Sequence, residues 1–410
     1  MLSVADVLPA EEVIAEGKSP ARAITRLLLT NFRSYSALSL ETGPQCVVLT
    51  GPNGAGKTNI LEALSVLAPG RGLRGAQLGE LARQADNTVQ QGQQPWAVSA
   101  QVTAHGVETQ IGAGFMPGSA GSVAKRVIRV DGETASSPAT LAHHVQFVWL
   151  TPAQDRLFTD GASDRRRFFD RLITSFHPLH ADRYSRFEKA MRERLSLLRS
   201  GHYSAVWVES LERTLAEEAV ALAASRLEGL GLLRAALAET DGQSAFPDAD
   251  VALDGNVELS LESMPALAAE DAFAQSLKSN RTQDAESGRT HSGPHLTDLI
   301  VYHRAKGREA RHCSTGEQKA LLIRMIFAAA AQASRRTGAA PVLLLDEIAA
   351  HLDLQRRQAL FGAITNLGAQ AWFTGTDHRP FEPLLPQAQI FDVSHGSVNK
   401  THHLHRGQKI

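Results

Sequence analysis

The sequence predicts an α/β fold in which a P-loop head, a mixed sheet with flanking helices, is interrupted by an inserted, mainly helical arm lobe. Three observations predict this fold. Residues 51–58 have the pattern of a phosphate-binding loop and lie between an apolar stretch and a helical pattern. A second apolar stretch, residues 342–345, ends in two acids. Between these motifs, residues 165–236 have a helical pattern almost free of Gly and Pro.

The individual elements follow from residue patterns in chain order. Alternating apolar and polar residues over 24–40 predict two strands and a turn. Short apolar runs predict buried strands, and apolar residues at helical spacing predict helices. We expect strands at 46–50, within 98–130, and at 145–150, 342–345 and 371–374, with helices at 59–67 and 320–333. Residues 241–271 are more irregular, since Gly and Pro recur there.

These patterns predict a head that is divided in sequence. The expected parts are a flexible extension at 1–22, the head at 23–160 and 289–398, the helical insertion at 161–288, and a mobile tail at 399–410. Two or three structural units also agree with the length of 410 residues.

The composition is that of a globular protein, with 43% hydrophobic and 21% charged residues. No apolar run approaches the roughly 20 residues of a membrane helix, and the N-terminus lacks a signal-peptide pattern. Two cysteines cannot form a disulfide framework or a cysteine-based zinc site. We therefore expect a cytoplasmic protein without a membrane partner. The net charge of −1 shows no basic excess that would indicate a nucleic-acid partner.

The loop at 51–58 reads G-P-N-G-A-G-K-T and fits G-x-x-x-x-G-K-[ST]. Its glycines let backbone N–H groups surround a phosphate at the start of a helix. We expect Lys57 to reach the β- and γ-phosphates of ATP and the Thr58 hydroxyl to bind Mg²⁺. The nucleotide-binding residues predicted here are Gly51, Asn53, Gly54, Gly56, Lys57, Thr58 and Asn59.

Asp346 and Glu347 follow the apolar run at 342–345, where a P-loop protein needs a second metal residue. We expect Asp346 to hold Mg²⁺ through water. Glu347 can act as general base on the attacking water. Glu347 and Lys57 are therefore the predicted catalytic residues, and ATP and Mg²⁺ the predicted cofactors.

Residues 314–319, S-T-G-E-Q-K, resemble the signature sequence of ABC-type ATPases, with Glu317 where transporters usually carry Gln. A Ser-x-Gly turn at a helix N-terminus offers a hydroxyl, N–H groups and a dipole to an anion. In ABC ATPases this turn completes the nucleotide site of the opposite subunit, so the resemblance assigns Ser314 and Gly316 to a partner's nucleotide. A simple Ser N-cap is the alternative.

Three further positions match ABC motifs less closely. Asp353 lies at the spacing of the D-loop after Glu347. Thr376 stands where the switch histidine usually sits; threonine can bond a γ-phosphate oxygen but carries no charge. Gln154 is a candidate Q-loop residue, and an ordinary loop role is an equal alternative.

The chain resembles the RecF family, bacterial recombination and gap-repair ATPases of the SMC-like branch of ABC ATPases, over residues 24 to about 395. The resemblance is carried by residues 29–35 (L-T-N-F-R-S-Y), 51–59, 151–152, 165–170 (R-R-R-F-F-D), 292–295 (S-G-P-H), 314–319 and 343–353. It implies that Arg33 contacts nucleotide phosphate. The family usually continues Gly-Pro-His with Arg-Asp-Asp, whereas this chain has Leu296 and Thr297 and retains Asp298 alone, which questions a charged role for this motif.

The resemblance implies a slow, DNA-stimulated ATPase of recombinational gap repair and replication restart. Its expected partners are double-stranded and gapped or single-stranded DNA, a second copy joined by ATP, and RecO and RecR, with which it would support RecA loading. The alternatives are another SMC-like chromosome-maintenance ATPase and a signalling or assembly ABC ATPase that binds no DNA. The insertion has no sustained heptad pattern, which argues against a long SMC coiled coil.

Basic residues in the loop at 70–75 and in the run at 165–199 are candidate DNA contacts. Residues 165–199 contain ten basic and four acidic residues, whereas 241–271 contain eight acidic residues and no basic one. Solvated surface is an equal alternative in both places, and residues 165–167 could pair with Asp155, Asp160 or Asp164. The predicted DNA contacts are Arg71, Arg74, Arg183, Arg186 and Lys189.

Overall fold

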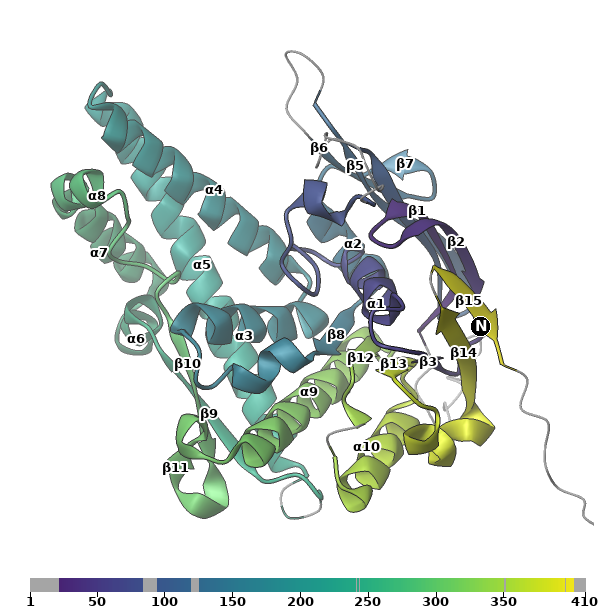
Figure 1. Ribbon diagram of the computed structural model, residues 1–410. Helices are drawn as coiled ribbons and strands as arrows, with labels where there is room; N and C mark the ends of the chain where they lie inside the picture. Colours follow the sequence, from purple (N-terminus) through teal and green to yellow (C-terminus); the bar gives the residue numbers. More distant parts are fainter. Residues whose placement is uncertain are drawn as a thin grey trace, which may run out of the picture.

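A computed structural model describes residues 22–401 apart from 84–93, 119–124, 241, 243, 350–351 and 395. The predicted N-terminal extension lies outside the described residues except for Arg22, and the predicted C-terminal tail except for residues 399–401, of which 399 and 400 belong to a strand. Figure 1 shows two sheets around helix α1, helices α9 and α10 beneath them, and a set of helices at the other side. No helix of the described part is long and apolar enough to cross a membrane.

A mixed sheet carries the predicted nucleotide motifs. Its strand order is β15-β14-β3-β13-β12-β8, with β15 antiparallel to β14 and all other neighbours parallel. The strands are β3 (Cys46–Thr50), β8 (Phe147–Leu150), β12 (Val342–Leu345), β13 (Ala371–Gly375), β14 (Ala388–Ser394) and β15 (Ser397–Lys400). Leu345 pairs with Phe373, and Gly375 pairs with Thr50. The segments that follow β3, β12 and β13 therefore meet at one edge of the sheet.

A second, antiparallel sheet has the order β2-β1-β4-β5-β6-β7. Its strands are β1 (Ala23–Phe32), β2 (Tyr35–Glu41), β4 (Trp96–Ala104), β5 (Val107–Met116), β6 (Lys125–Val130) and β7 (Glu133–Thr134). Helix α1 (Lys57–Ser65) lies between the two sheets, since its residues Ile60 and Leu64 share one buried cluster with Leu29 of β1 and Leu49 of β3. This packing holds the start of α1 in a fixed position.

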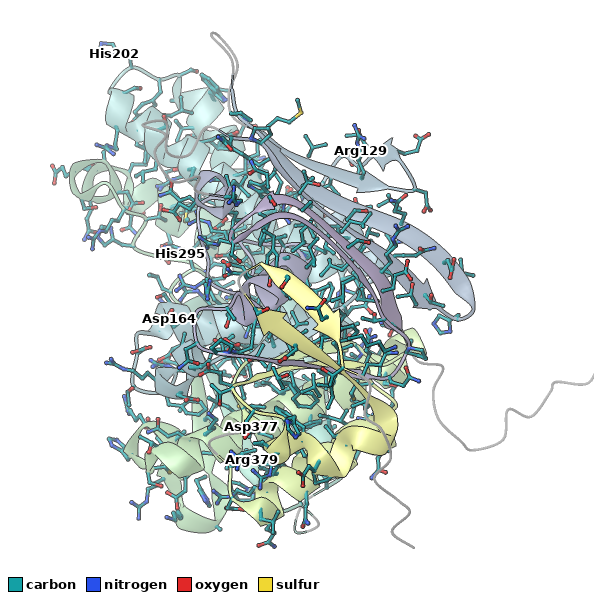
Figure 2. All side chains as sticks on the ribbon, turned by 45° about the vertical axis from the view of Figure 1, so that its right-hand side comes forward. Arg129, Asp164, His202, His295, Asp377 and Arg379 are labelled. Carbon is teal, nitrogen blue, oxygen red and sulfur yellow. The ribbon has the colours of Figure 1, made fainter. Side chains whose placement is uncertain are left out.

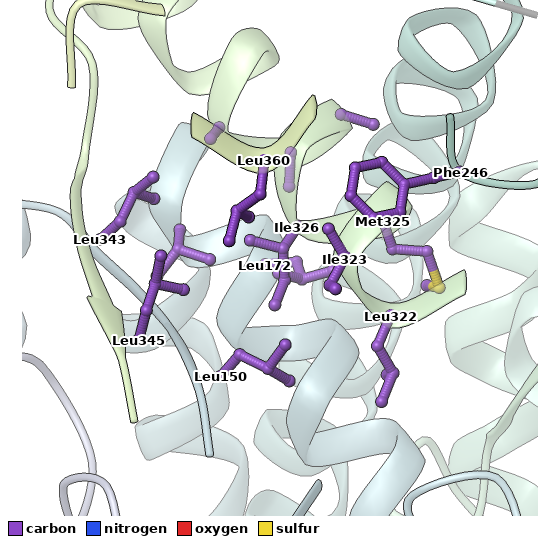
Figure 3. Close-up of a cluster of buried hydrophobic side chains, with 14 of the residues drawn as sticks. Leu150, Leu172, Phe246, Leu322, Ile323, Met325, Ile326, Leu343, Leu345 and Leu360 are labelled. Atoms are coloured by element: carbon purple, nitrogen blue, oxygen red, sulfur yellow. The ribbon is translucent and has the colours of Figure 1, made fainter. Parts of the chain in front are cut away.

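The opposite face of the mixed sheet packs against helices. Helix α9 (Thr315–Thr337) crosses this face, and α3 (Ala162–Phe176) and α10 (Leu354–Leu367) lie beside it. Figure 3 shows Leu322 and Ile326 of α9 in one cluster with Leu343 and Leu345 of β12. Burial of such side chains contributes roughly 1.5–3 kcal/mol each, so α9 is firmly attached to the sheet.

The remaining helices form the lobe at the left of Figure 1. They are α4 (Leu179–Ser200), α5 (Ala205–Ala238), α6 (Asn256–Ser263), α7 (Ala266–Ser279) and α8 (Arg281–Ser287). Figure 2 shows His202, between α4 and α5, at the far tip of this lobe from Asp377 and Arg379. The short helix α2 (Leu141–His144) precedes β8.

The expected strands and helices at 24–40, 46–50, 59–67, 98–130, 145–150, 320–333, 342–345 and 371–374 are confirmed, with shifts of a few residues at their ends. Residues 241–271 are more regular than expected, because they contain β9 (Ala249–Asp254), α6 and the start of α7. Strand β9 pairs with β10 (Asp298–His303), which pairs with β11 (Arg308–Glu309). This sheet joins residues on both sides of the predicted boundary at 288, and the boundary itself stays a prediction.

A buried arginine ties the helical lobe together. Arg226 of α5 is fully buried and forms ion pairs with Asp170 of α3 at 2.8 Å and with Glu258 of α6 at 3.2 Å. It also donates a hydrogen bond to the carbonyl oxygen of Pro294. Burial alone would raise the pKa of Asp170, but the charge of Arg226 and a hydrogen bond from His180 hold it well below its usual range.

The retained acid of the Gly-Pro-His motif has a charged role, contrary to the doubt raised from the sequence. Asp298 forms a two-pronged ion pair with Arg165, with Nε–Oδ1 and Nη2–Oδ2 distances of 2.8 Å. Of the pairings expected for residues 165–167, Arg167 does pair with Asp164. The Arg165–Asp298 pair was missed because its members lie 133 positions apart in the sequence.

Candidate nucleotide-binding site

The phosphate-binding loop runs from the end of β3 to the start of α1, as its motif predicts. Gly51 has φ of 142° and Gly56 has φ of 109°, a region that favours glycine. A Cβ atom would lie 2.2 Å from the carbonyl oxygen of Val393 at Gly51 and 2.7 Å from the Tyr35 hydroxyl at Gly56. The two glycines are therefore required by both conformation and space.

Lys57, the first residue of α1, is buried within the loop. Its Nζ donates hydrogen bonds to the carbonyl oxygens of Gly51 at 2.7 Å and Pro52 at 2.8 Å. Burial lowers the pKa of Lys57, while the carboxylates of Glu347 and Asp346 act in the opposite direction. The ammonium group is thus held beside the N-terminus of α1, where an anion would bind.

Two hydroxyl groups converge on the predicted metal residue. Thr58 Oγ1 donates to Asp346 Oδ1 at 2.9 Å, and Thr374 Oγ1 donates to the same oxygen at 2.7 Å. Oxygen donors of this kind suit Mg²⁺, which is commonly held by one or two protein groups together with water and phosphate oxygens. Among the described residues, no group of three or more His, Cys, Asp or Glu side chains is placed to hold a metal ion.

Glu347 lies in a left-handed backbone conformation with φ of 52°. This conformation is uncommon outside glycine and often occurs at functional sites. The backbone N–H of Glu347 donates to Thr374 Oγ1 at 2.9 Å. Thr374 therefore bridges Asp346 and the predicted general base. The residue pattern had pointed to Thr376 for this position, because it shows no pairing between strands.

Three other predicted site residues, Thr376, Gln154 and Asp353, lie outside the hydrogen bonds that join Thr374 to Asp346 and Glu347. Thr376 is exposed after β13. Gln154 lies in the turn after β8, where its Oε1 accepts a hydrogen bond from the backbone N–H of Thr151 at 3.0 Å. Asp353 caps α10 by accepting from the backbone N–H of Arg356 at 2.8 Å. The contacts of Gln154 and Asp353 are those of local turn and helix caps.

A buried carboxylate links two predicted arginines that had been given different roles. Glu62 of α1 accepts from Arg33 at 2.7 Å and from Arg74 at 3.1 Å. Arg74 also donates to Asn59 Oδ1 at 3.0 Å, and Asn59 donates to Ser34 Oγ at 3.0 Å. Arg74, predicted to contact DNA, therefore lies in the same hydrogen-bonded group as Arg33 and Asn59, which were predicted to contact nucleotide.

The signature residues lie apart from this site. Ser314 caps α9 together with Glu317, whose carboxylate accepts from the backbone N–H of Ser314 at 3.1 Å. An ion pair with Lys306 and the bonds to Ser314 lower the pKa of Glu317 to about 2. Ser314 and Gly316 are exposed, and Figure 1 places the start of α9 beside β11, away from the start of α1. Ser314 can therefore cap α9 and still be open to an anion from the solvent side.

The predicted DNA contacts differ in their surroundings. Arg186 pairs with Glu218 at 2.7 Å, and Lys189 is exposed with Glu193 at 3.9 Å. Arg183 donates to the carbonyl oxygen of Ala221 at 3.4 Å. Arg71 is exposed beyond α1, as is Asn53 in the phosphate-binding loop. Their roles toward DNA and nucleotide stay predictions.

Comparisons with known proteins agree with this geometry. The family described as RecF/RecN/SMC N terminal domain matches residues 23–396. The DNA replication and repair protein RecF of Rhizobium rhizogenes is 46% identical over 378 residues, covering 92% of this chain and 98% of that protein. RecF of Agrobacterium fabrum is 46% identical over 376 residues, with coverage of 92% and 98%. A solved structure of the recombination mediator protein RecF-ATP in the RecFOR pathway has a TM-score of 0.78 at 22% identity, covering 93% of this chain and 100% of that chain.

Proposed function

The chain belongs to the RecF family, and we propose that it is an ATP-dependent DNA-binding protein of recombinational gap repair and replication restart. The meeting of the phosphate-binding loop, Asp346 and Glu347 at one sheet edge carries the ATP-dependent part of this proposal, and the signature turn lies elsewhere on the surface. The similarity to RecF proteins of DNA replication and repair supports the rest. Such a site can hold ATP but needs a second copy to surround it.

We propose that Lys57 and the N–H groups at the start of α1 bind the ATP phosphates. Thr58 and Asp346 would hold Mg²⁺, which when bound neutralises developing charge on the phosphates. Glu347 would take a proton from the attacking water, and Thr374 would keep the Glu347 backbone in place. The reaction would be slow, DNA-stimulated hydrolysis of ATP to ADP and phosphate.

A second copy would complete the site. In this proposal Ser314 and Gly316 of each chain bind the γ-phosphate held by the other chain, which gives a two-fold symmetric dimer. Their exposure at the N-terminus of the long helix α9 supports this arrangement. The dimer would bind double-stranded DNA near single-strand gaps and support RecA loading with RecO and RecR in the cytoplasm.

Dimerisation can be tested with Ser314→Arg, which places a bulky side chain at the proposed contact. We expect this variant to bind ATP with wild-type affinity but to remain monomeric in light scattering. Ser279→Arg makes the same change on the exposed end of α7 and should still dimerise. An ATP-dependent dimer of Ser314→Arg equal to that of the wild type would exclude the proposed contact.

DNA binding can be tested by titrating gapped and fully duplex DNA at several salt concentrations, with and without ATP. Phosphate contacts release counterions, so affinity should fall linearly on a log–log plot against salt. We expect ATP to strengthen binding and to steepen this slope, because a dimer doubles the number of contacts. Binding that is absent, or unchanged by ATP, would favour an assembly ATPase that does not act on DNA.

A further inference from the structure

A polar cavity lies at the edge of the mixed sheet opposite the phosphate-binding loop. Its volume is about 340 Å³, within the lower range of small-molecule sites. Its lining comes from β4, β5 and the turn between them, α2, the residues before β1, β8 and α4, and the end of α9. Gln146, which lines it, directly precedes β8, whereas the nucleotide motifs follow the ends of the parallel strands. The cavity is therefore distinct from the ATP site.

Arg22 brings a buried positive charge to this cavity. The residue is only 4% exposed, and its Nη1 makes one long hydrogen bond, 3.4 Å, to the carbonyl oxygen of Ala339. Its Nε is buried without a hydrogen-bond partner. Among the described residues, no Asp or Glu forms an ion pair with Arg22 or lines the cavity. A buried charge without an opposite charge is costly, so an anion in the cavity would stabilise this arrangement.

Gln146 supplies a complementary acceptor. It is also 4% exposed, and its Nε2 donates to the carbonyl oxygen of Ala142, whereas its Oε1 is buried without a partner. Arg22 and Gln146 both line the cavity, so a cation and an amide that each carry a polar atom without a partner lie at its wall. Water can satisfy either group but leaves the charge of Arg22 without compensation.

Histidines complete the polar lining. His105, His143 and His144 all face the cavity, and His105 Nε2 lies 3.2 Å from the carbonyl oxygen of Thr337. Burial lowers the pKa of His144, the nearby Asp131 raises it, and His143 lowers it. Asp131 is outside the lining, so no acid competes with an anion within the cavity itself.

We propose that this cavity binds hydrogen phosphate. An oxyanion that also carries a hydroxyl proton matches both unpaired groups, since its charged oxygens can accept from Arg22 and its P–OH can donate to Gln146. Sulfate has the same shape and charge but carries no proton at neutral pH. Comparing the affinities for the two ions therefore shows whether the cavity recognises the negative charge alone or also the proton of hydrogen phosphate.

The test is calorimetric titration of the full chain with sodium phosphate and sodium sulfate at constant ionic strength. The Lys57→Ala background weakens competing binding at the phosphate-binding loop. We expect one phosphate per chain, and at least tenfold weaker binding in Arg22→Met, since charge-assisted hydrogen bonds are strong. Gln146→Leu should weaken phosphate binding about fivefold and leave sulfate unchanged, as expected for the loss of one hydrogen bond.

Arg26→Met is the matched control, because Arg26 is exposed on the neighbouring strand β1 and lies outside the cavity lining. It should bind phosphate as the parent does. Phosphate binding that survives Arg22→Met, or sulfate binding as tight as phosphate binding in the parent, would overturn the proposal. If Arg22→Met does not fold, the phosphate-to-sulfate comparison and Gln146→Leu still decide the outcome.

Discussion

Replacing Thr374 by valine removes one hydroxyl from the centre of the proposed ATPase site while keeping the side-chain shape. Thr374 is 1% exposed, and the change removes one hydrogen-bond partner from each of two polar groups. The Glu347 N–H loses an acceptor at 2.9 Å, and Asp346 Oδ1 loses a donor at 2.7 Å. Asp346 keeps its bond from Thr58. The expected loss of stability is about 2–3 kcal/mol, from one unsatisfied, partly buried N–H and one lost bond to a charged group.

The larger effect should fall on turnover. Glu347 has an unfavourable left-handed backbone that the Thr374 hydroxyl supports. A displaced general base loses the alignment on which proton transfer depends. We expect kcat to fall about 10- to 100-fold in Thr374→Val, with the affinity for ATP changed less than about threefold.

The assay is steady-state ATP hydrolysis at saturating ATP, with nucleotide binding measured separately. Thr374→Ser restores the hydroxyl and should recover turnover to within about threefold of the wild type. Thr376→Val tests the position that the sequence had favoured, and we expect little effect because Thr376 is exposed outside the network. Wild-type turnover in a folded Thr374→Val protein, or a larger loss in Thr376→Val, would refute this reasoning.

Three other changes test the site and the fold. Lys57→Ala should abolish ATP binding, because it removes the buried cation of the phosphate-binding loop; equilibrium dialysis showing wild-type affinity would exclude this site. Glu347→Gln should trap an ATP-bound dimer in light scattering, and rapid turnover would exclude Glu347 as the base. Arg226→Met should cost about 3–5 kcal/mol at pH 7, since it leaves Asp170 and Glu258 buried without their cation. The stability of this variant should rise as the pH falls from 7 to 5, because burial without a cation raises the pKa of a carboxyl and protonation then removes its charge. Denaturant unfolding that shows no such rise would contradict this explanation.

The sequence predicted best those features that depend on local pattern. The phosphate-binding loop, the strand before it and the acid-bearing strand β12 all follow from short-range spacing, and their arrangement matches the prediction. The bridge made by Thr374 was missed because it depends on the pairing of β12 with β13, which no local pattern shows. The link between Arg33 and Arg74 was missed for the same reason, since Glu62 joins two separate loops.

Acidic residues from other parts of the chain neutralise some of the positive charge in the run at 165–199. Arg165 is neutralised by Asp298, and the buried Arg194 pairs with Glu212 at 3.0 Å and Asp284 at 2.6 Å. These acids all lie outside the run, so a local excess of positive charge does not become an equal excess on the surface. One chain should therefore make few DNA phosphate contacts, and its binding should weaken only modestly with salt. In the proposed dimer, ATP would join two chains and double those contacts, so the DNA titration should show tighter binding with ATP although the net charge of one chain is −1.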